Sequence, residues 1–191
     1  GFNSFGVHLW WICLPDGGTL TVKTDAKYGD RRLAQIRTVV ADMVGLDRPD
    51  LAVLEEAPPG LKGPAIKAIH MVQGVVRLAL LDLGVPYAVV NPSTLKVYAT
   101  GRKGADKTAM AMAAFKRAGL EFADSDQCDA WWLRTMGLDR FGLAPFILPV
   151  AQRAALDSVT WPAVPDRVGV SATTGRVPVR VVPTVAYRSP S

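Results

Sequence analysis

The stretch Leu51-Ala52-Val53-Leu54-Glu55-Glu56 decides the fold class. Four consecutive apolar residues that end abruptly at two glutamates predict a short strand buried on both faces. Such a strand is typical of the middle of a parallel sheet covered by helices on both sides. Its carboxyl end, at Glu55, is where ligands and reacting groups gather in open α/β sheets.

The elements around this strand alternate between strands and helices. Upstream, the β-rich runs 7–13 and 19–24 predict an antiparallel hairpin, and apolar residues spaced three and four apart predict a helix that begins at Asp30. Downstream, the pattern predicts a helix over 63–83, a strand over 87–90, and helices over 105–118 and 126–136. The order indicates an α/β domain over residues 1–148 with a partly parallel sheet. From residue 149 onward Pro, Val, Thr, Ser and Arg dominate, so we expect an extended or disordered tail over 149–191 with no site of its own.

The composition bounds the class of protein. With 191 residues, of which 49% are hydrophobic, the chain is long enough for one domain and a tail. Charged residues interrupt every apolar run before it reaches the roughly 18 residues of a membrane span, and no secretory signal pattern opens the chain. Cys13 and Cys128 lie far apart, as expected of two reduced thiols in a cytoplasmic protein. The net charge of +5 fits a nucleic-acid partner without requiring one.

Three carboxylates are candidate metal ligands. Asp126 and Asp129 are three residues apart and therefore share one face of their helix, and carboxylate oxygens are ligands that Mg²⁺ prefers. Acidic residues at a helix start also stabilise the helix dipole, which is enough to explain Asp124. Asp129 lies past that first turn and next to a core-facing stretch, where a carboxylate needs a partner. Glu55 ends the buried strand, although the two glutamates could simply begin a solvated loop, and strand phase alone does not choose between Glu55 and Glu56.

Four cations lie in the glycine-containing segment 96–107, which we interpret as a basic loop leading into a helix. Cations and free amides in such a loop can follow a phosphate backbone, and a solvated loop is the alternative interpretation. The segment is not a Walker A loop, because Asp106 takes the place of the glycine before Lys107-Thr108. The four candidate DNA-binding residues are Lys96, Arg102, Lys103 and Lys107.

Taken in order, these motifs resemble the RuvC Holliday-junction resolvases of the RNase H-like nuclease superfamily. The resemblance spans residues 1–137. It rests on the strand that ends at Glu55, the Pro92-x-x-x-Lys96 segment with Thr100-Gly101 and Ala105-Asp106-Lys107, and the helical Asp126-Gln127-Cys128-Asp129-Ala130. It implies an RNase H-like mixed sheet flanked by helices.

The function implied by the resemblance is metal-dependent cutting of Holliday junctions or other branched DNA. Two Mg²⁺ or Mn²⁺ ions would be held by Glu55, Asp126 and Asp129 together with a further aspartate, and the four cations of segment 96–107 would hold DNA phosphates. The resemblance also implies a homodimer, for which the helix over 63–83 is the candidate interface, and a bacterial or phage-infected cytoplasm.

The chain opens differently from the family pattern. The family's first strand ends in Asp-Pro-Gly and is followed by Gly-hydrophobic-Gly-Val, and residues 1–7 of this chain align with the second half of that motif. The first, central strand and its catalytic aspartate would then lie upstream of Gly1. The chain is accordingly interpreted either as a fragment, which the intact later motifs favour, or as a degenerate copy. With three carboxylates of four, it is expected to cut little or not at all.

Two other functions stay open. One is a related nuclease that acts on flaps, forks or RNA–DNA hybrids. The other is a non-catalytic protein that binds branched DNA and keeps the fold. A doubly wound small-molecule enzyme is disfavoured, because no dinucleotide glycine pattern follows any strand.

Overall fold

The computed structural model describes residues 4–8, 11–13, 19–21, 29–57, 60, 64–164 and 185–186. The strands within 4–21 and at 185–186, and residues 64–65, enter the description only through their backbone.

A six-stranded mixed sheet forms the centre of the molecule, in the order β5-β4-β1-β2-β3-β6. Strand β4 pairs in parallel with both β1 and β5, β2 pairs antiparallel with β1 and β3, and β6 lies parallel to β3. This confirms the predicted mixed sheet and hairpin. The strands are β1 (Ser4–His8), β2 (Trp11–Cys13), β3 (Thr19–Thr21), β4 (Leu51–Glu55), β5 (Tyr87–Val90) and β6 (Val185–Ala186).

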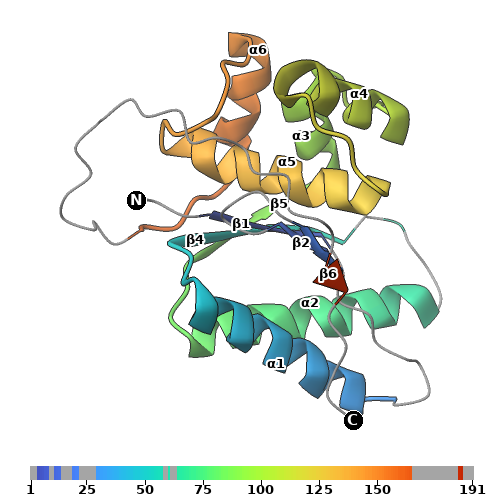
Figure 1. The fold of residues 1–191 in the computed structure, drawn as a ribbon, viewed down its shortest axis with the longest axis vertical. Coiled ribbons are helices and arrows are strands. Elements are labelled where there is room, and N and C mark those ends of the chain that lie inside the picture. The colour runs from blue at the N-terminus through green and yellow to red at the C-terminus, as the bar shows by residue number, and fades with distance from the viewer. Residues whose placement is uncertain are drawn as a thin grey trace.

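Helices cover both faces of the sheet (Figure 1). On one face lie α1 (Arg31–Leu46) and α2 (Pro64–Asp82), which share a hydrophobic cluster with Ala52 and Leu54 of β4. On the other face α5 (Ser125–Arg140) packs on β1, β2 and β4, and α3 (Pro92–Thr100) and α4 (Lys107–Ala118) pack on α5. Leu51 and Val53 belong to that second cluster. The buried, two-faced strand predicted at 51–54 is thus confirmed.

Helix α5 carries much of the core between the sheet and α3 and α4. Trp131 and Trp132 are buried and pack against each other edge to face, with ring centroids 4.8 Å apart. Tyr98 of α3 meets Trp132 in the same T-shaped manner. The stretch next to Asp129, which the sequence predicts to face the core, is thus buried. Trp10 and the side chain of Trp11 lie outside the described residues.

The first strand prediction is wrong in one respect: the apolar run 7–13 is not one strand. Ser4–His8 and Trp11–Cys13 are separate strands that pair antiparallel, with Val7 opposite Ile12, so a run that is continuous in sequence folds back on itself. In this sheet β1 takes the central place between β4 and β2. The expectation of a further strand upstream of Gly1 concerns residues beyond the chain and stays a prediction.

The interpretation of segment 96–107 as one loop is also wrong, because its first five residues belong to helix α3. Asn91 caps this helix by accepting a 2.9 Å hydrogen bond from the backbone N–H of Ser93, and Pro92 has the fixed φ that suits a first helical turn. Gly101 ends the helix in the left-handed conformation, at φ 79°. The true basic turn is therefore Gly101–Asp106.

The predicted extended tail is wrong for its first part. Val150–Arg153 form helix α6, and Ala154–Ser158 form a 3-10 helix, η2. Leu156 and Val159 are buried in the core beneath α3, and the indole N–H of Trp161 donates to the Leu156 carbonyl at 2.9 Å. The packed domain thus continues beyond residue 148. Residues 165–184 and 187–191 lie outside the described residues.

Within the described part of the chain, no helix is long and apolar enough to span a membrane.

Candidate active site

The carboxyl end of β4 is held from two sides. Gln73 of α2 donates its side-chain N–H to the Glu55 carbonyl at 2.9 Å, and the backbone N–H of Glu56 donates to the Val90 carbonyl at 2.8 Å. Glu55 is half-buried, whereas Glu56 is exposed and accepts a hydrogen bond from the Asn91 amide at 3.4 Å. A half-buried carboxylate at a fixed strand end is better placed than its exposed neighbour to face a bound group.

A hollow of about 240 Å³ lies next to this strand end. It is lined by Glu56 and Ala57, which follow β4, and by His70, Gln73, Gly74 and Arg77 of α2. The end of β4 therefore borders open space rather than packed core.

The N-terminal part of α5 carries the other two candidate carboxylates, Asp126 in its first turn and Asp129 just past it. Asp124 caps the helix by accepting hydrogen bonds from the backbone N–H groups of Asp126 and Gln127, at 3.0 and 2.9 Å. Asp124 is therefore explained by its place at the helix start, where it serves as the N-cap. Asp126 and Asp129 are both half-buried, and the Asp126 side chain keeps 24% of its surface exposed. Both carboxylates are thus within reach of solvent.

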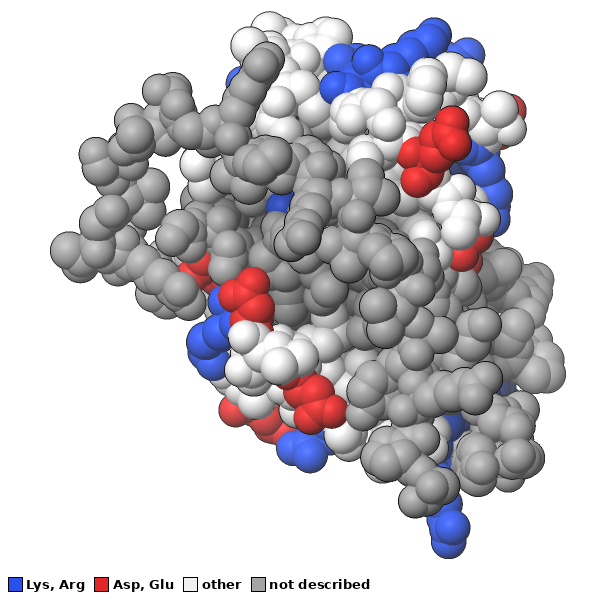
Figure 2. All heavy atoms as spheres, in the orientation of Figure 1, with Lys and Arg blue, Asp and Glu red and all other residues white. Residues whose placement is uncertain are grey.

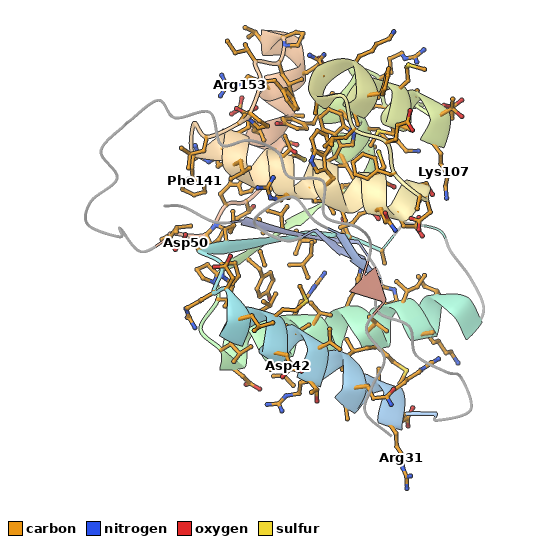
Figure 3. All side chains as sticks on the ribbon, viewed as in Figure 1. Arg31, Asp42, Asp50, Lys107, Phe141 and Arg153 are labelled. Carbon is orange, nitrogen blue, oxygen red and sulfur yellow. The ribbon has the colours of Figure 1, made fainter. Side chains whose placement is uncertain are left out.

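The topology brings the two parts of the candidate site to one edge of the sheet. Asp50, which precedes β4, and Phe141, which follows α5, lie at the same end of the molecule, and Lys107 lies at the opposite end (Figure 3). Since α5 runs opposite to β4, its first turn lies toward the edge where β4 ends (Figure 1). Glu55, Asp126 and Asp129 therefore come from neighbouring elements at that edge.

The donor set fits a hard divalent cation, because all three candidate groups are carboxylates. Within the described ranges, however, no group of three or more His, Cys, Asp and Glu side chains is gathered closely enough to hold a metal ion. The assignment of Glu55, Asp126 and Asp129 as ligands stays a prediction.

Lys107 lies directly beside Asp126. As the first residue of α4 it donates to the Ser125 hydroxyl at 2.7 Å, and its Nζ lies 3.8 Å from Asp126 Oδ1. The Ser125 hydroxyl in turn donates to Asp126 Oδ1 at 3.2 Å. The Lys107 side chain is 77% exposed, so its ammonium group faces both the carboxylate and solvent. A cation in this position can neutralise Asp126 or contact an incoming phosphate.

The other candidate cations lie on or after α3. Lys96 is half-buried on that helix, whereas Arg102 and Lys103 are exposed in the basic turn. Lys and Arg side chains gather over the end of the molecule formed by α3, α4 and α6 (Figure 2). This distribution suits a polyanion that approaches from the α3–α4 side of the site.

One polar cluster was not anticipated from the sequence. Asp139 of α5 is buried, accepts from Arg153 Nε at 3.0 and 3.2 Å, and accepts from the Tyr98 hydroxyl at 3.1 Å. Burial, and then the negative charge of Asp139, raise the pKa of Tyr98 well above its ordinary value. One indication of this cluster was available. Asp139 follows the buried Thr135 and Met136 by one helical turn and so shares their face of the helix, where a buried carboxylate requires a partner.

Cys128 lies between the two site aspartates but points into the core. Burial, and then the nearby charge of Asp129, raise the pKa of its thiol to about 12. The thiol is therefore protonated and unreactive at neutral pH, in agreement with the structural role expected of it.

The fold of this chain is RuvC-like, since two solved structures of Thermus thermophilus RuvC share it. One has a TM-score of 0.58 and 20% identity and covers 74% of this chain and 97% of that one. The other, RuvC in complex with a Holliday junction substrate, has a TM-score of 0.61 and 21% identity and covers 75% and 98%. No family model matches the sequence.

The amino-acid sequence is also similar to that of a RuvC protein. The chain is 33% identical over 100 residues to the crossover junction endodeoxyribonuclease RuvC of Gloeobacter violaceus, a match that covers 52% of this chain and 57% of that protein. The chain is thus RuvC-like in both sequence and fold.

Proposed function

We propose that this chain is a metal-dependent endonuclease for branched DNA, with the four-way junction as its substrate. The observation that carries the proposal is the convergence of the end of β4 and the start of α5 on one edge, with Lys107 3.8 Å from Asp126. The similarity to a protein named as a crossover junction endodeoxyribonuclease supports the reaction class. The solved neighbour in complex with a Holliday junction supports the substrate class.

Glu55, Asp126 and Asp129 would hold two Mg²⁺ or Mn²⁺ ions, together with a further carboxylate. What such ions supply when bound is a lowered pKa for the attacking water and neutralisation of the charge that develops on the leaving oxygen. Asp126 and Asp129 share one face of α5, so both carboxylates could bind the metal ions from the same side. Lys107 would hold a phosphate oxygen near Asp126 and keep the scissile strand close to the carboxylates.

The basic turn and Lys96 would hold the flanking phosphates. Contacts of this kind orient DNA without reading its sequence. Each phosphate contact contributes roughly 0.9 to the slope of log affinity against log salt on duplex DNA. Four contacts, by Lys96, Arg102, Lys103 and Lys107, therefore predict a slope contribution of about 3.6.

A pair of substitutions in α5 tests the ligand assignment. Asp129→Asn is expected to remove metal-dependent cutting of a synthetic four-way junction while junction binding survives. Asp124→Asn is the matched control, because asparagine caps a helix as well as aspartate does, so cutting and binding should both stay unchanged. Loss of binding together with cutting in Asp129→Asn would assign Asp129 a structural role instead.

The cutting assays compare this chain with a form to which the Asp-Pro-Gly strand of the family pattern has been added. The added aspartate is expected to raise Mg²⁺-dependent cutting, because it would be the further carboxylate of a two-ion site. Equal cutting by both forms would contradict the fourth-ligand argument and leave the proposed junction substrate unaffected.

A non-catalytic binder of branched DNA is the second candidate. It is favoured by the finding that, in the described part of the chain, no three potential metal ligands are gathered together. A Mn²⁺ titration followed by calorimetry separates the two functions. Binding that Asp129→Asn removes and Asp124→Asn keeps supports the nuclease, and absence of binding in all three proteins supports the binder.

We further propose that the protein acts as a homodimer through α2. Met71, Leu78 and Leu81 are large apolar side chains of this helix that remain exposed in the single chain. Leu78→Glu is expected to shift the molecular mass in light scattering from dimer to monomer. A monomeric wild type would contradict this proposal.

A further inference from the structure

Helix α6 and η2 link the three helices that surround the basic turn. Arg153 reaches Asp139 on α5, and the Ser158 and Thr94 hydroxyls lie 3.4 Å apart, which joins η2 to α3. Gln152, the residue before Arg153, is buried, with 6% of its surface exposed, and its Oε1 accepts a 2.9 Å hydrogen bond from Arg117 of α4.

The same glutamine borders the first residue of the basic turn. Gly101 is left-handed, and a Cβ added there would lie 3.7 Å from Gln152 Cγ and 3.9 Å from its Nε2. The Gln152 side chain therefore lies next to Gly101, on the side where a Cβ would project. Gln152 thus lies beside the end of the helix that precedes the turn and is hydrogen-bonded to the helix that follows it.

The remainder of the turn has its own restraints. The Thr100 hydroxyl donates to the Lys96 carbonyl at 2.8 Å and accepts from the Arg102 N–H at 3.2 Å. At the far end Ala105 is buried, and Asp106 caps α4 by accepting from the Ala109 N–H at 2.7 Å. Arg102 and Lys103 extend into solvent from a backbone that is fixed at both ends.

We infer that Gln152 is a positioning residue for DNA binding: it fixes the basic turn so that Arg102 and Lys103 meet the phosphate backbone. This inference rests on the proposed function. Its physical reason is entropic, because a backbone already ordered before binding does not lose that freedom when the phosphates arrive. A buried amide is retained at this position because Arg117 satisfies its oxygen, whereas an apolar residue would leave the Arg117 donor without that acceptor.

The first test measures the turn without DNA. Limited trypsin digestion, followed by mass spectrometry, compares cleavage after Arg102 and Lys103 in the wild type and in Gln152→Leu. Cleavage after Arg134, in the middle of α5, reports unfolding of the whole domain. We expect Gln152→Leu to raise cleavage in the turn several-fold and to leave cleavage after Arg134 unchanged.

Two controls make this result specific. Gln152→Glu keeps an acceptor for Arg117 and should behave as the wild type. Ser158→Ala removes a contact of the same segment that does not touch the turn, and it should also leave the turn protected. Unchanged cleavage in Gln152→Leu, or an equal rise in the turn and after Arg134, overturns the inference.

The second test measures junction affinity against salt concentration. Arg102→Ala with Lys103→Ala removes two phosphate contacts and should lower the slope by about 1.8. Gln152→Leu should lower the slope in the same direction, and adding it to the double variant should change nothing further. A wild-type slope in Gln152→Leu overturns the inference. Failure of the wild type to bind junctions overturns the proposed function instead, and the digestion still decides whether Gln152 holds the turn.

Discussion

Asp139 is expected to be the carboxylate on which the stability of the domain depends most. Its side chain is 6% exposed, and it accepts from Arg153 at 3.0 and 3.2 Å and from Tyr98 at 3.1 Å. Asp139→Asn keeps the volume and an oxygen for the Tyr98 hydroxyl but removes the charge. Asp139→Ala removes all three hydrogen bonds and leaves the buried Tyr98 hydroxyl without this acceptor.

The magnitudes follow from burial. Breaking a fully buried ion pair costs about 3–5 kcal/mol, but Arg153 is 48% exposed, and water compensates much of its loss. We therefore expect Asp139→Asn to cost about 1–2 kcal/mol, the range of a charge-assisted hydrogen bond. Asp139→Ala also removes the shorter hydrogen bond of the buried Tyr98 hydroxyl, which keeps only the Thr135 carbonyl at 3.4 Å among its hydrogen bonds in the described structure, and should cost about 3 kcal/mol in total.

Urea unfolding at pH 7, followed by tryptophan fluorescence, measures these free energies. A cycle with Arg153→Met isolates the pair and should give a coupling of about 1 kcal/mol, because the two side chains are in contact. Equal losses for Asp139→Asn and Asp139→Ala would show that the Tyr98 hydroxyl contributes nothing. An Asp139→Ala protein within about 0.5 kcal/mol of the wild type, the usual range for surface substitutions, would refute the whole argument.

Three further predictions concern the start of α5. The pKa of the Cys128 thiol is raised from 9.0 to about 12, so the unfolded chain loses this proton first as pH rises. The free energy of unfolding should therefore fall above pH 9. Measured between pH 9 and 10 in a Cys13→Ser background, this fall should be shallower after Cys128→Ala. Lys107→Met should change the free energy of unfolding by less than about 1 kcal/mol, because the pair of Lys107 with Asp126 is exposed. The same variant should lower the slope of log junction affinity against log salt by roughly 0.9. A larger loss of stability in urea unfolding would contradict the exposed-pair argument. Asp124→Ala removes the cap of α5 and should cost about 1 kcal/mol in urea unfolding, whereas an unchanged midpoint would contradict the capping role.

The elements that the sequence predicts best are those whose apolar pattern is local. Leu51–Leu54 is apolar at every position, and β4 is buried on both faces. The helix α1 has apolar residues at helical spacing, and five of them are buried. In both cases the apolar pattern of neighbouring residues is enough to predict the secondary structure and which side chains are buried.

Helix α3 was missed although its ends are marked. Its polar residues Lys96 and Thr100 resemble a basic loop, and only nine residues separate Asn91 from Gly101. The cap, the proline after it and the left-handed glycine together mark a short helix. These start and stop residues are better evidence for the secondary structure here than the charge pattern that suggested a loop.

The segment after residue 148 was missed for a different reason. Helix α6 has four residues and η2 has five, too short for any periodicity to emerge. What orders them is contact with distant residues, namely Arg153 with Asp139, Gln152 with Arg117, and Leu156 with the core beneath α3. Such long-range contacts leave no local pattern in the sequence.

Two aspartates of α5 differ in how readily they could bind a cation. Asp126 and Asp139 belong to one helix, yet their surroundings differ. Asp139 meets Arg153 and Tyr98 in a buried cluster. Asp126 lies 3.8 Å from the highly exposed Lys107, accepts from the Ser125 hydroxyl and stays within reach of solvent. A carboxylate already committed to a buried arginine and tyrosine could bind a cation only by leaving both donors unsatisfied. The ion pair of Asp126 with Lys107 is exposed, and such a pair stabilises the fold by at most about 1 kcal/mol. Because an exposed pair costs less to release than a buried cluster, we expect a metal ion to bind at the start of α5 and not at its buried end.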